Sequence, residues 1–243
     1  MKLLLVLDDD SLRGYVHVST SETVIGARSR GCIGDDSRSA TSDQGCCSVK
    51  LTVEPLTPDR WPDLEAVFKA RGCSVARSCW CMAYRLSGSG EPLPRGMTRA
   101  AMNRARLKAL VDAGNPPGLI GYRGKEAVGW VSIGPREQYA KLKLSPVMKA
   151  VDEQPVWSII CFVVPTEHRG QGVAQALLNG AVTYARKQGA RLVEAYPVDK
   201  RARSNDDTMW FGAKAMYDKA GFKEVSRRKP HRPVVRMKLR SGT

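Results

Sequence analysis

From Leu51 onward, hydrophobic and polar positions follow two periodic patterns. Alternating or continuously apolar runs indicate strands, and apolar positions repeating every three to four residues between caps and glycine stops indicate helices. The predicted strands are 51–56, 118–123, 127–133, 156–164, 191–198, 222–226 and 233–239, and the predicted helices are about 58–72, 98–114, 173–189 and 208–220. The order β-α-α-β-β-β-α-β-α-β-β predicts an α/β fold of the α+β kind, built on one mixed sheet.

The run VWSIICFVV, residues 156–164, differs from the other predicted strands because it is apolar throughout. A strand of that kind is buried on both faces, so we expect it to be the central strand. Pro165 ends it, and a glycine-bearing turn then leads into the helix that begins near Val173.

The first fifty residues show neither the strand pattern nor the helix pattern. Residues 1–50 are rich in Ser, Thr, Gly and Asp, and they carry 6 basic and 7 acidic groups, whereas the whole chain has a net charge of +15. We expect residues 1–50 to be a disordered leader, or the product of a translation start placed too far upstream. The folded domain is predicted to span 51–243.

Charge and cysteine content narrow the class of protein. The positive surplus favours anionic partners, and seven scattered cysteines in a chain of 243 residues suit a reducing, cytoplasmic setting. The longest stretch without charge or proline, residues 170–185, has 16 residues, fewer than the roughly 18 needed to span a bilayer. Asp8 follows the apolar start at once, which argues against a signal peptide.

The turn after the central strand carries the most specific chemistry. Gly170 and Gly172 stand directly before a helix, where backbone N–H groups without internal partners bind phosphate. Val173 and Ala174 stand where an ATP-binding Walker A loop needs Lys and Ser or Thr, and Gln175 stands where a dinucleotide fingerprint needs its third glycine. The turn therefore predicts a phosphate site of a different kind.

The residues of this turn resemble the acetyl-coenzyme A loop of the GNAT superfamily of N-acetyltransferases, [RQ]-x-x-G-x-[GA]. The matching residues are Arg169, Gly170, Gln171, Gly172, Val173 and Ala174. A second family signature, Tyr-x-x-x-Gly-Phe, matches residues 217–222, and the order of elements also agrees. The resemblance implies transfer of acetyl from acetyl-CoA to the primary amine of a small molecule or peptide. It also implies that the pyrophosphate lies on residues 169–174 and that the pantetheine arm pairs with Phe162, Val163 and Val164.

The resemblance also implies catalytic roles. Tyr217 takes the position of the general acid that serves the departing thiolate. A glutamate common on the central strand of the family is missing from residues 157–162, so Glu194 on the next strand is the candidate base and a chain of water molecules is the alternative. No metal is expected, and dimers are common in the family, so a homodimer is one expectation.

Other interpretations stay open. Cys73, Cys79 and Cys81 lack the spacing of a zinc site, and the segment around them could instead shape the acceptor side. Residues 223–240 hold 8 basic residues against Glu224 alone, yet they lack the aromatic residues of a nucleic-acid surface. The alternatives to the enzyme are a module that binds coenzyme A or another phosphorylated ligand without turnover, and, less favoured, a nucleic-acid-binding protein.

Overall fold

The computed structural model describes residues 50–87, 92–199 and 209–239. The predicted leader, apart from Lys50, lies outside the described residues. None of the helices in the described ranges is long and apolar enough to cross a membrane.

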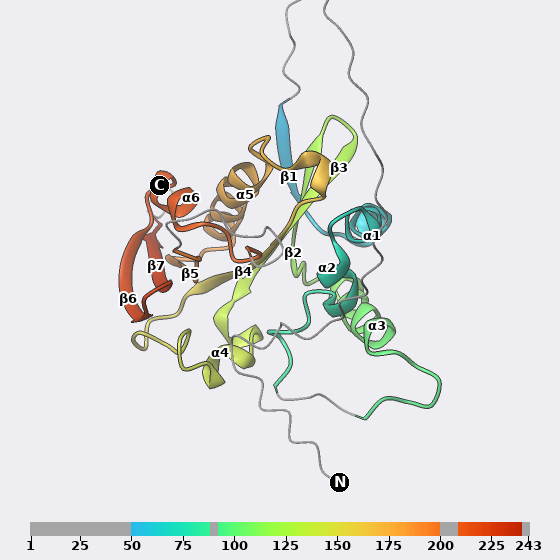
Figure 1. Ribbon diagram of the computed structural model, residues 1–243, viewed down its shortest axis with the longest axis horizontal. Coiled ribbons are helices and arrows are strands. Elements are labelled where there is room, and N and C mark those ends of the chain that lie inside the picture. Colours follow the sequence, from blue (N-terminus) through green and yellow to red (C-terminus); the bar gives the residue numbers. More distant parts are fainter. Residues whose placement is uncertain (1–49, 88–91, 200–208, 240–243) are drawn as a thin grey trace, which may run out of the picture. The chain divides into compact units, whose positions relative to one another are not determined.

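One seven-stranded mixed sheet forms the centre of the fold, in the order β1-β2-β3-β4-β5-β7-β6 (Figure 1). The strands are β1 (Leu51–Pro55), β2 (Gly118–Arg123), β3 (Glu126–Pro135), β4 (Trp157–Val163), β5 (Leu192–Ala195), β6 (Lys223–Lys229) and β7 (Arg232–Lys238). Only the pair β4 and β5 is parallel, and the other neighbouring pairs are antiparallel. The apolar run 156–164 is therefore the central strand, as its composition predicts, and the mixed α/β class is confirmed.

The helices follow the predicted order, with two additions. They are α1 (Trp61–Lys69), α2 (Ser74–Cys79), α3 (Arg99–Asp112), α4 (Lys141–Leu144), α5 (Val173–Lys187) and α6 (Lys214–Lys219), joined by 3-10 turns η1 (Pro58–Arg60), η2 (Arg136–Gln138) and η3 (Thr166–His168). The short helices α2 and α4 were not predicted, because six and four residues are too few to show a period. The Thr98 side chain caps α3 by accepting a hydrogen bond from the Ala101 N–H, at 3.1 Å.

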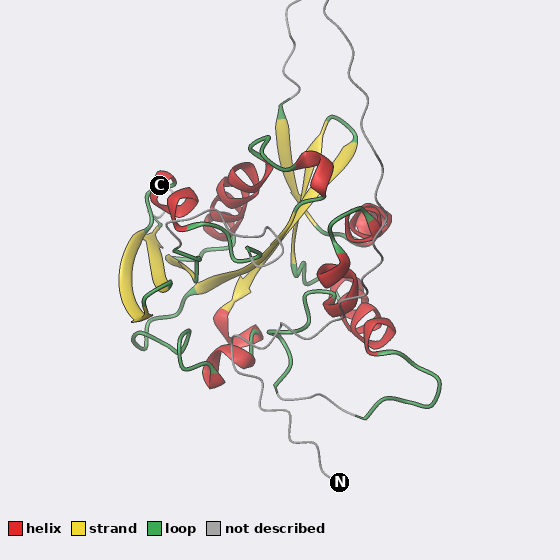
Figure 2. Ribbon diagram, in the orientation of Figure 1, coloured by secondary structure: helices red, strands yellow, loops and turns green. Residues whose placement is uncertain are grey.

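Helices cover both faces of the sheet, with α5 on one side of β3 and β4 and α1 to α3 on the other (Figures 1 and 2). Residues that alternate along β2 and β3 divide between the two faces: Leu119 and Val131 join the α5 cluster, whereas Ile120 and Trp130 join the cluster of α1 to α3. This two-sided burial fixes the register, because a slip of one residue would exchange the faces.

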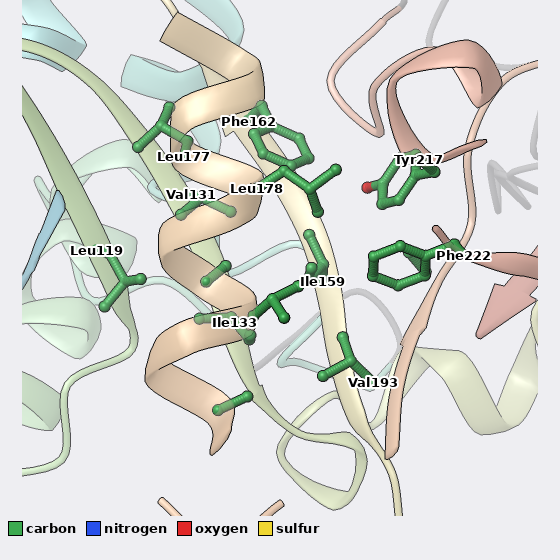
Figure 3. Packing of buried hydrophobic residues seen from close by; sticks show 14 of the residues in the cluster. Leu119, Val131, Ile133, Ile159, Phe162, Leu177, Leu178, Val193, Tyr217 and Phe222 are labelled. Atoms are coloured by element: carbon green, nitrogen blue, oxygen red, sulfur yellow. The ribbon is translucent and has the colours of Figure 1, made fainter. Parts of the chain in front are cut away.

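The helix that follows the glycine turn packs closely on the sheet. A Cβ atom on Gly180 of α5 would come within 2.5 Å of Val53 in β1, and one on Gly129 of β3 would come within 3.0 Å of Leu177 and Val173. The glycines therefore allow α5 to approach the strands. Leu178 of this helix lies beside β4 in Figure 3, whereas Leu177 points to the other side, toward Gly121 of β2 and Gly129 of β3.

Candidate active site

The central strand leaves its parallel neighbour halfway along. Register pairs join β4 to β5 only from Trp157 with Val193 to Ile159 with Ala195, while β4 continues to Val163. An irregularity in the pairing with β3 leaves Ile160 as an extra residue just where the two strands part. The edge of β4 from Cys161 onward is thus turned away from β5.

A loop segment occupies part of that edge. The Phe162 N–H donates to the carbonyl oxygen of Trp210 at 2.6 Å, so the residues before α6 lie against β4 here. Phe162 is one of the three residues predicted to pair with the pantetheine arm. Such pairing at Phe162 requires the bond to Trp210 to open, whereas Val163 and Val164 lie closer to the glycine turn.

The turn between β4 and α5 has the backbone shape that its glycines predict. Gly170 and Gly172 have φ angles of +72° and +78°, and a Cβ atom on either would meet nothing within 4 Å. Gly172 is the N-cap of α5, and no side chain caps the helix there. The space beside these glycines is open, and the first N–H groups of the helix have no capping side chain at Gly172, which suits a phosphate.

The side chains of Arg169 and Gln171 form hydrogen bonds with other residues of the chain. The Arg169 Nε donates to the Val164 carbonyl at 3.0 Å, and its guanidinium also donates to the Gly72 carbonyl at 2.9 Å. Gln171 accepts a hydrogen bond from Arg123 at 2.6 Å. In this structure Arg169 links the end of β4 to the turn after α1. The backbone of the glycine turn, rather than the Arg169 side chain, is therefore the main feature that could bind an anion.

Tyr217 is fully buried on α6 and points toward the central strand. Its ring packs edge-on against Phe162 and Phe222, with centroids 6.4 Å and 5.2 Å away, and its hydroxyl is directed toward Leu178 and β4 in Figure 3. The hydroxyl donates to the Phe211 carbonyl at 2.9 Å. Burial holds the pKa of Tyr217 well above its usual value, so the phenol stays protonated at neutral pH.

Glu194, the candidate base, lies in a buried network of charges. Its Oε1 accepts from Arg136 at 2.7 Å and from the Tyr196 hydroxyl at 2.5 Å, and its Oε2 accepts from Arg236 at 2.7 Å. The Glu194 side chain has no exposed surface. A carboxylate bound to two guanidiniums and cut off from solvent is poorly suited to take a proton from an incoming amine.

Three cysteines, Cys79, Cys81 and Cys161, form a chain of thiols. Cys81 is in hydrogen-bond contact with Cys79 and with Cys161 of β4, and the hydrogen bond with Cys161 is the largest cause of the raised pKa of Cys81. Trp80 and Cys81 both have left-handed φ angles, 47° and 48°, a strained conformation for residues other than glycine. Within the described ranges no group of three or more His, Cys, Asp or Glu side chains is arranged to hold a metal ion.

Two aromatic side chains at this end of β4 did not stand out in the sequence. Tyr84 and Phe211 meet edge-on with centroids 5.5 Å apart, and they share a hydrophobic cluster with Cys161. The available signals were aromatic residues in otherwise irregular stretches, in CWCMAYR and in the MWF of residues 209–211. Only the fold brings them together.

The basic residues of the C-terminal strands are largely engaged within the domain. Arg228 donates to three carbonyls of the segment before β4, those of Val147, Lys149 and Ala150. Arg227 pairs with Glu224 and Asp199, and Arg236 pairs with Glu194 and Asp152. These arginines serve the fold, which weakens the case for a nucleic-acid surface; Arg240 lies outside the described residues.

Comparison with known proteins identifies the class. Residues 80–222 match the model of the Acetyltransferase (GNAT) family, and the chain belongs to this family of acyltransferases, which use acetyl-CoA. The match includes both the glycine turn and Tyr217. The family resemblance on which the sequence analysis relied is therefore confirmed.

Solved acetyltransferase structures are similar to the chain at low identity. An acetyltransferase from Thermus thermophilus has 18% identity and a TM-score of 0.45, with 79% of this chain and 99% of that chain covered. A polyamine N-acetyltransferase from Drosophila melanogaster has 13% identity and a TM-score of 0.46, with 78% and 100% covered. An N-acetyltransferase from Staphylococcus aureus has 13% identity and a TM-score of 0.45, with 79% and 99% covered. No curated protein sequence matches the chain.

Proposed function

We propose that this chain transfers the acetyl group of acetyl-CoA to a primary amine by direct attack within a ternary complex. The observation that carries the proposal is the open glycine turn at the amino end of α5, directly after the central strand, in a chain that belongs to the GNAT family. The parting of β4 from β5 supports it, because it leaves an edge of β4 for an extended ligand.

The residues present fit this cosubstrate. Gly170 and Gly172 leave open space before the uncapped end of α5, where the pyrophosphate would lie, and the edge at Val163 and Val164 continues from it. When bound, acetyl-CoA supplies the thioester carbonyl that the amine attacks. A bond forms between the amine nitrogen and the acetyl carbon, the carbon–sulfur bond breaks, and the nitrogen loses a proton.

Tyr217 acts in this proposal through its neutral phenol. A thiol has an ordinary pKa of about 8.5 and a phenol one of about 10, and burial raises the pKa of Tyr217 further. Complete proton transfer from the phenol to the departing thiolate is therefore unfavourable at equilibrium. We expect Tyr217 to donate a hydrogen bond to the sulfur, in exchange for its bond to the Phe211 carbonyl.

The proton of the amine leaves through water rather than through Glu194. Both oxygens of that carboxylate are bound by arginines and none of its surface is exposed. Positioning of the two reactants on a rigid strand then supplies much of the rate enhancement.

An assay of free thiol released from acetyl-CoA tests the proposal. Wild type incubated with a panel of primary amines should release thiol in step with the formation of acetylated amine, while Tyr217→Phe should retain cofactor affinity but lose about 10- to 100-fold in turnover. Cofactor binding without thiol release on any amine would instead favour the module that binds without turnover.

A further inference from the structure

The β2–β3 hairpin lies beside the glycine turn of the proposed cofactor site, at the same end of the sheet (Figure 1). The pairing of β3 with β4 ends at Trp130 with Val163, so the earlier residues of β3 extend past the end of β4. There the Glu126 Oε1 lies 3.5 Å from the His168 Nε2. The hairpin is therefore held against the segment that leads from β4 into α5.

Arg123, the last residue of β2, places its guanidinium on the glycine turn itself. Its Nη1 donates to the Gln171 Oε1 at 2.6 Å, and Gln171 stands between the two glycines of the turn. The Gln171 Nε2 in turn donates to the Glu167 carbonyl at 2.6 Å, which fixes the orientation of the amide. In the described part of the chain, the Arg123 guanidinium makes no other hydrogen bond or ion pair. Its remaining N–H groups can therefore donate to a further acceptor.

Arg169, the arginine of the family motif, is placed differently. Its side chain reaches away from the turn to the carbonyls of Val164 and Gly72, at 3.0 Å and 2.9 Å. If Arg169 turned to a phosphate, the end of β4 would lose its link to the turn after α1. Arg123 would give up only its bond to a neutral amide, and a hydrogen bond between a guanidinium and a phosphate is roughly twice as strong as a neutral one.

The acidic groups of the neighbouring segments do not neutralise Arg123. Glu126 faces the imidazole described above, and the Glu167 side chain is exposed. None of the ion pairs within the described residues includes Arg123. Its register partner in β1 is Leu51, and residues 44–50, which precede Leu51 in the chain, contain no Asp or Glu.

We propose that Arg123 is a further binding residue for acetyl-CoA, which donates hydrogen bonds to the phosphate groups of the cofactor in place of its bond to Gln171. The proposal rests on the proposed function, because it takes the glycine turn as the cofactor site. The phosphates are then held by two elements, the backbone N–H groups that begin α5 and a side chain from the β2–β3 hairpin. Arg123 acts on the affinity for the cofactor and not on the chemical step.

Calorimetric titration of acetyl-CoA into three variants tests the assignment without any need for turnover. Arg123→Gln should raise the Kd about three- to tenfold, the effect of a partly exposed charge-assisted contact, and Arg123→Lys, which keeps the charge, should raise it less. The matched control is Arg186→Gln, which removes the same charge from an exposed position in the last turn of α5, at the opposite end of that helix. Its Kd should equal that of the wild type.

Salt distinguishes a contact between charges from a structural effect on the turn. The difference in Kd between Arg123→Gln and the wild type should shrink as salt is added, because the attraction of partly exposed charges is screened. Equal Kd values for Arg123→Gln and the wild type, an equal rise in Arg186→Gln, or a difference that does not change with salt overturns the inference and leaves the proposed function intact. No binding of acetyl-CoA to the wild type overturns both.

The acetyl thioester of dephospho-CoA, which lacks the 3′-phosphate, identifies the phosphate that Arg123 contacts. If Arg123→Gln also weakens the binding of this ligand, the contact is to the pyrophosphate. If Arg123→Gln and the wild type bind this ligand equally while they differ for acetyl-CoA, the contact is to the 3′-phosphate. Either result supports Arg123 as a binding residue.

Discussion

Replacement of Glu194 by glutamine separates a structural carboxylate from a catalytic one. Glutamine keeps the shape of the side chain but removes the charge that Arg136 and Arg236 bind, each at 2.7 Å. Arg236 keeps Asp152 at 2.7 Å, whereas Arg136 has no second carboxylate partner within the described residues. Loss of one partner from a buried pair costs about 3 to 5 kcal/mol, so we expect the free energy of unfolding to fall by about that amount.

Urea and thermal unfolding measure this change. For a domain of this size, a loss of about 3 to 5 kcal/mol corresponds to a fall in Tm of about 6 to 20 °C. Arg136→Met should cause a comparable loss, and the double variant should lose less than the sum, because the two residues interact directly. Glu153→Gln, at an exposed position, should be neutral.

Activity measured where the variant is still folded completes this experiment. Because the proton of the amine leaves through water in our proposal, Glu194→Gln should keep turnover within about tenfold of wild type, with the pH profile unchanged in shape. Unchanged stability together with a loss of turnover of about 100-fold or more would refute the reasoning and return Glu194 to the role of base.

Three further predictions concern the helices α5 and α6 and their contacts. Tyr217→Phe removes the hydrogen bond to the Phe211 carbonyl, so in addition to its lower turnover it should lose about 1 kcal/mol of stability, measured by urea unfolding. Gly180→Ala should destabilise the domain by about 1 to 3 kcal/mol, since the new Cβ would lie 2.5 Å from Val53. Val53→Gly removes all three crowding atoms, so Gly180→Ala should cost less stability in the Val53→Gly background than in the wild type, and an equal cost in both backgrounds would contradict the assigned contact.

The parts of the fold that depend on local pattern could be predicted from the sequence. The apolar run 156–164 identifies the central strand by its composition, and the glycines after it need positive φ angles that few other residues adopt. The proline and threonine caps place the first helices within a few residues. The predicted strand 191–198 and helix 208–220 are shorter in the structure, as β5 and α6. Gly212 has a φ angle of +79° and Ala213 forms an isolated β-bridge with Val198, so the helix begins only at Lys214, while residue 208 lies outside the described residues.

The parts of the site that depend on distant partners could not be predicted. The Arg169 side chain turns back to Gly72, 97 residues earlier in the chain, and Glu194 meets Arg136, 58 residues away. Nothing in the sequence around these residues indicates such partners. The same holds for Tyr84 and Phe211, which lie in separate irregular segments and meet edge-on only in the folded protein.

Two glycines at the opposite ends of α5 allow the central claim to be tested with a matched control. Gly172 at the amino end and Gly189 after the carboxyl end have nearly equal φ angles, +78° and +80°, and neither has an atom within 4 Å of an added Cβ. Aspartate at either position therefore causes similar backbone strain, but only Gly172→Asp puts a negative charge where the pyrophosphate would bind.

Calorimetric titration of acetyl-CoA into the wild type, Gly172→Asp and Gly189→Asp at one salt concentration is the most direct test. Our account predicts binding to the wild type and to Gly189→Asp, with Gly172→Asp weakened by about 10-fold or more while circular dichroism shows the fold intact. Equal binding by all three proteins, or no binding to the wild type, would contradict the assignment of the turn as the cofactor site.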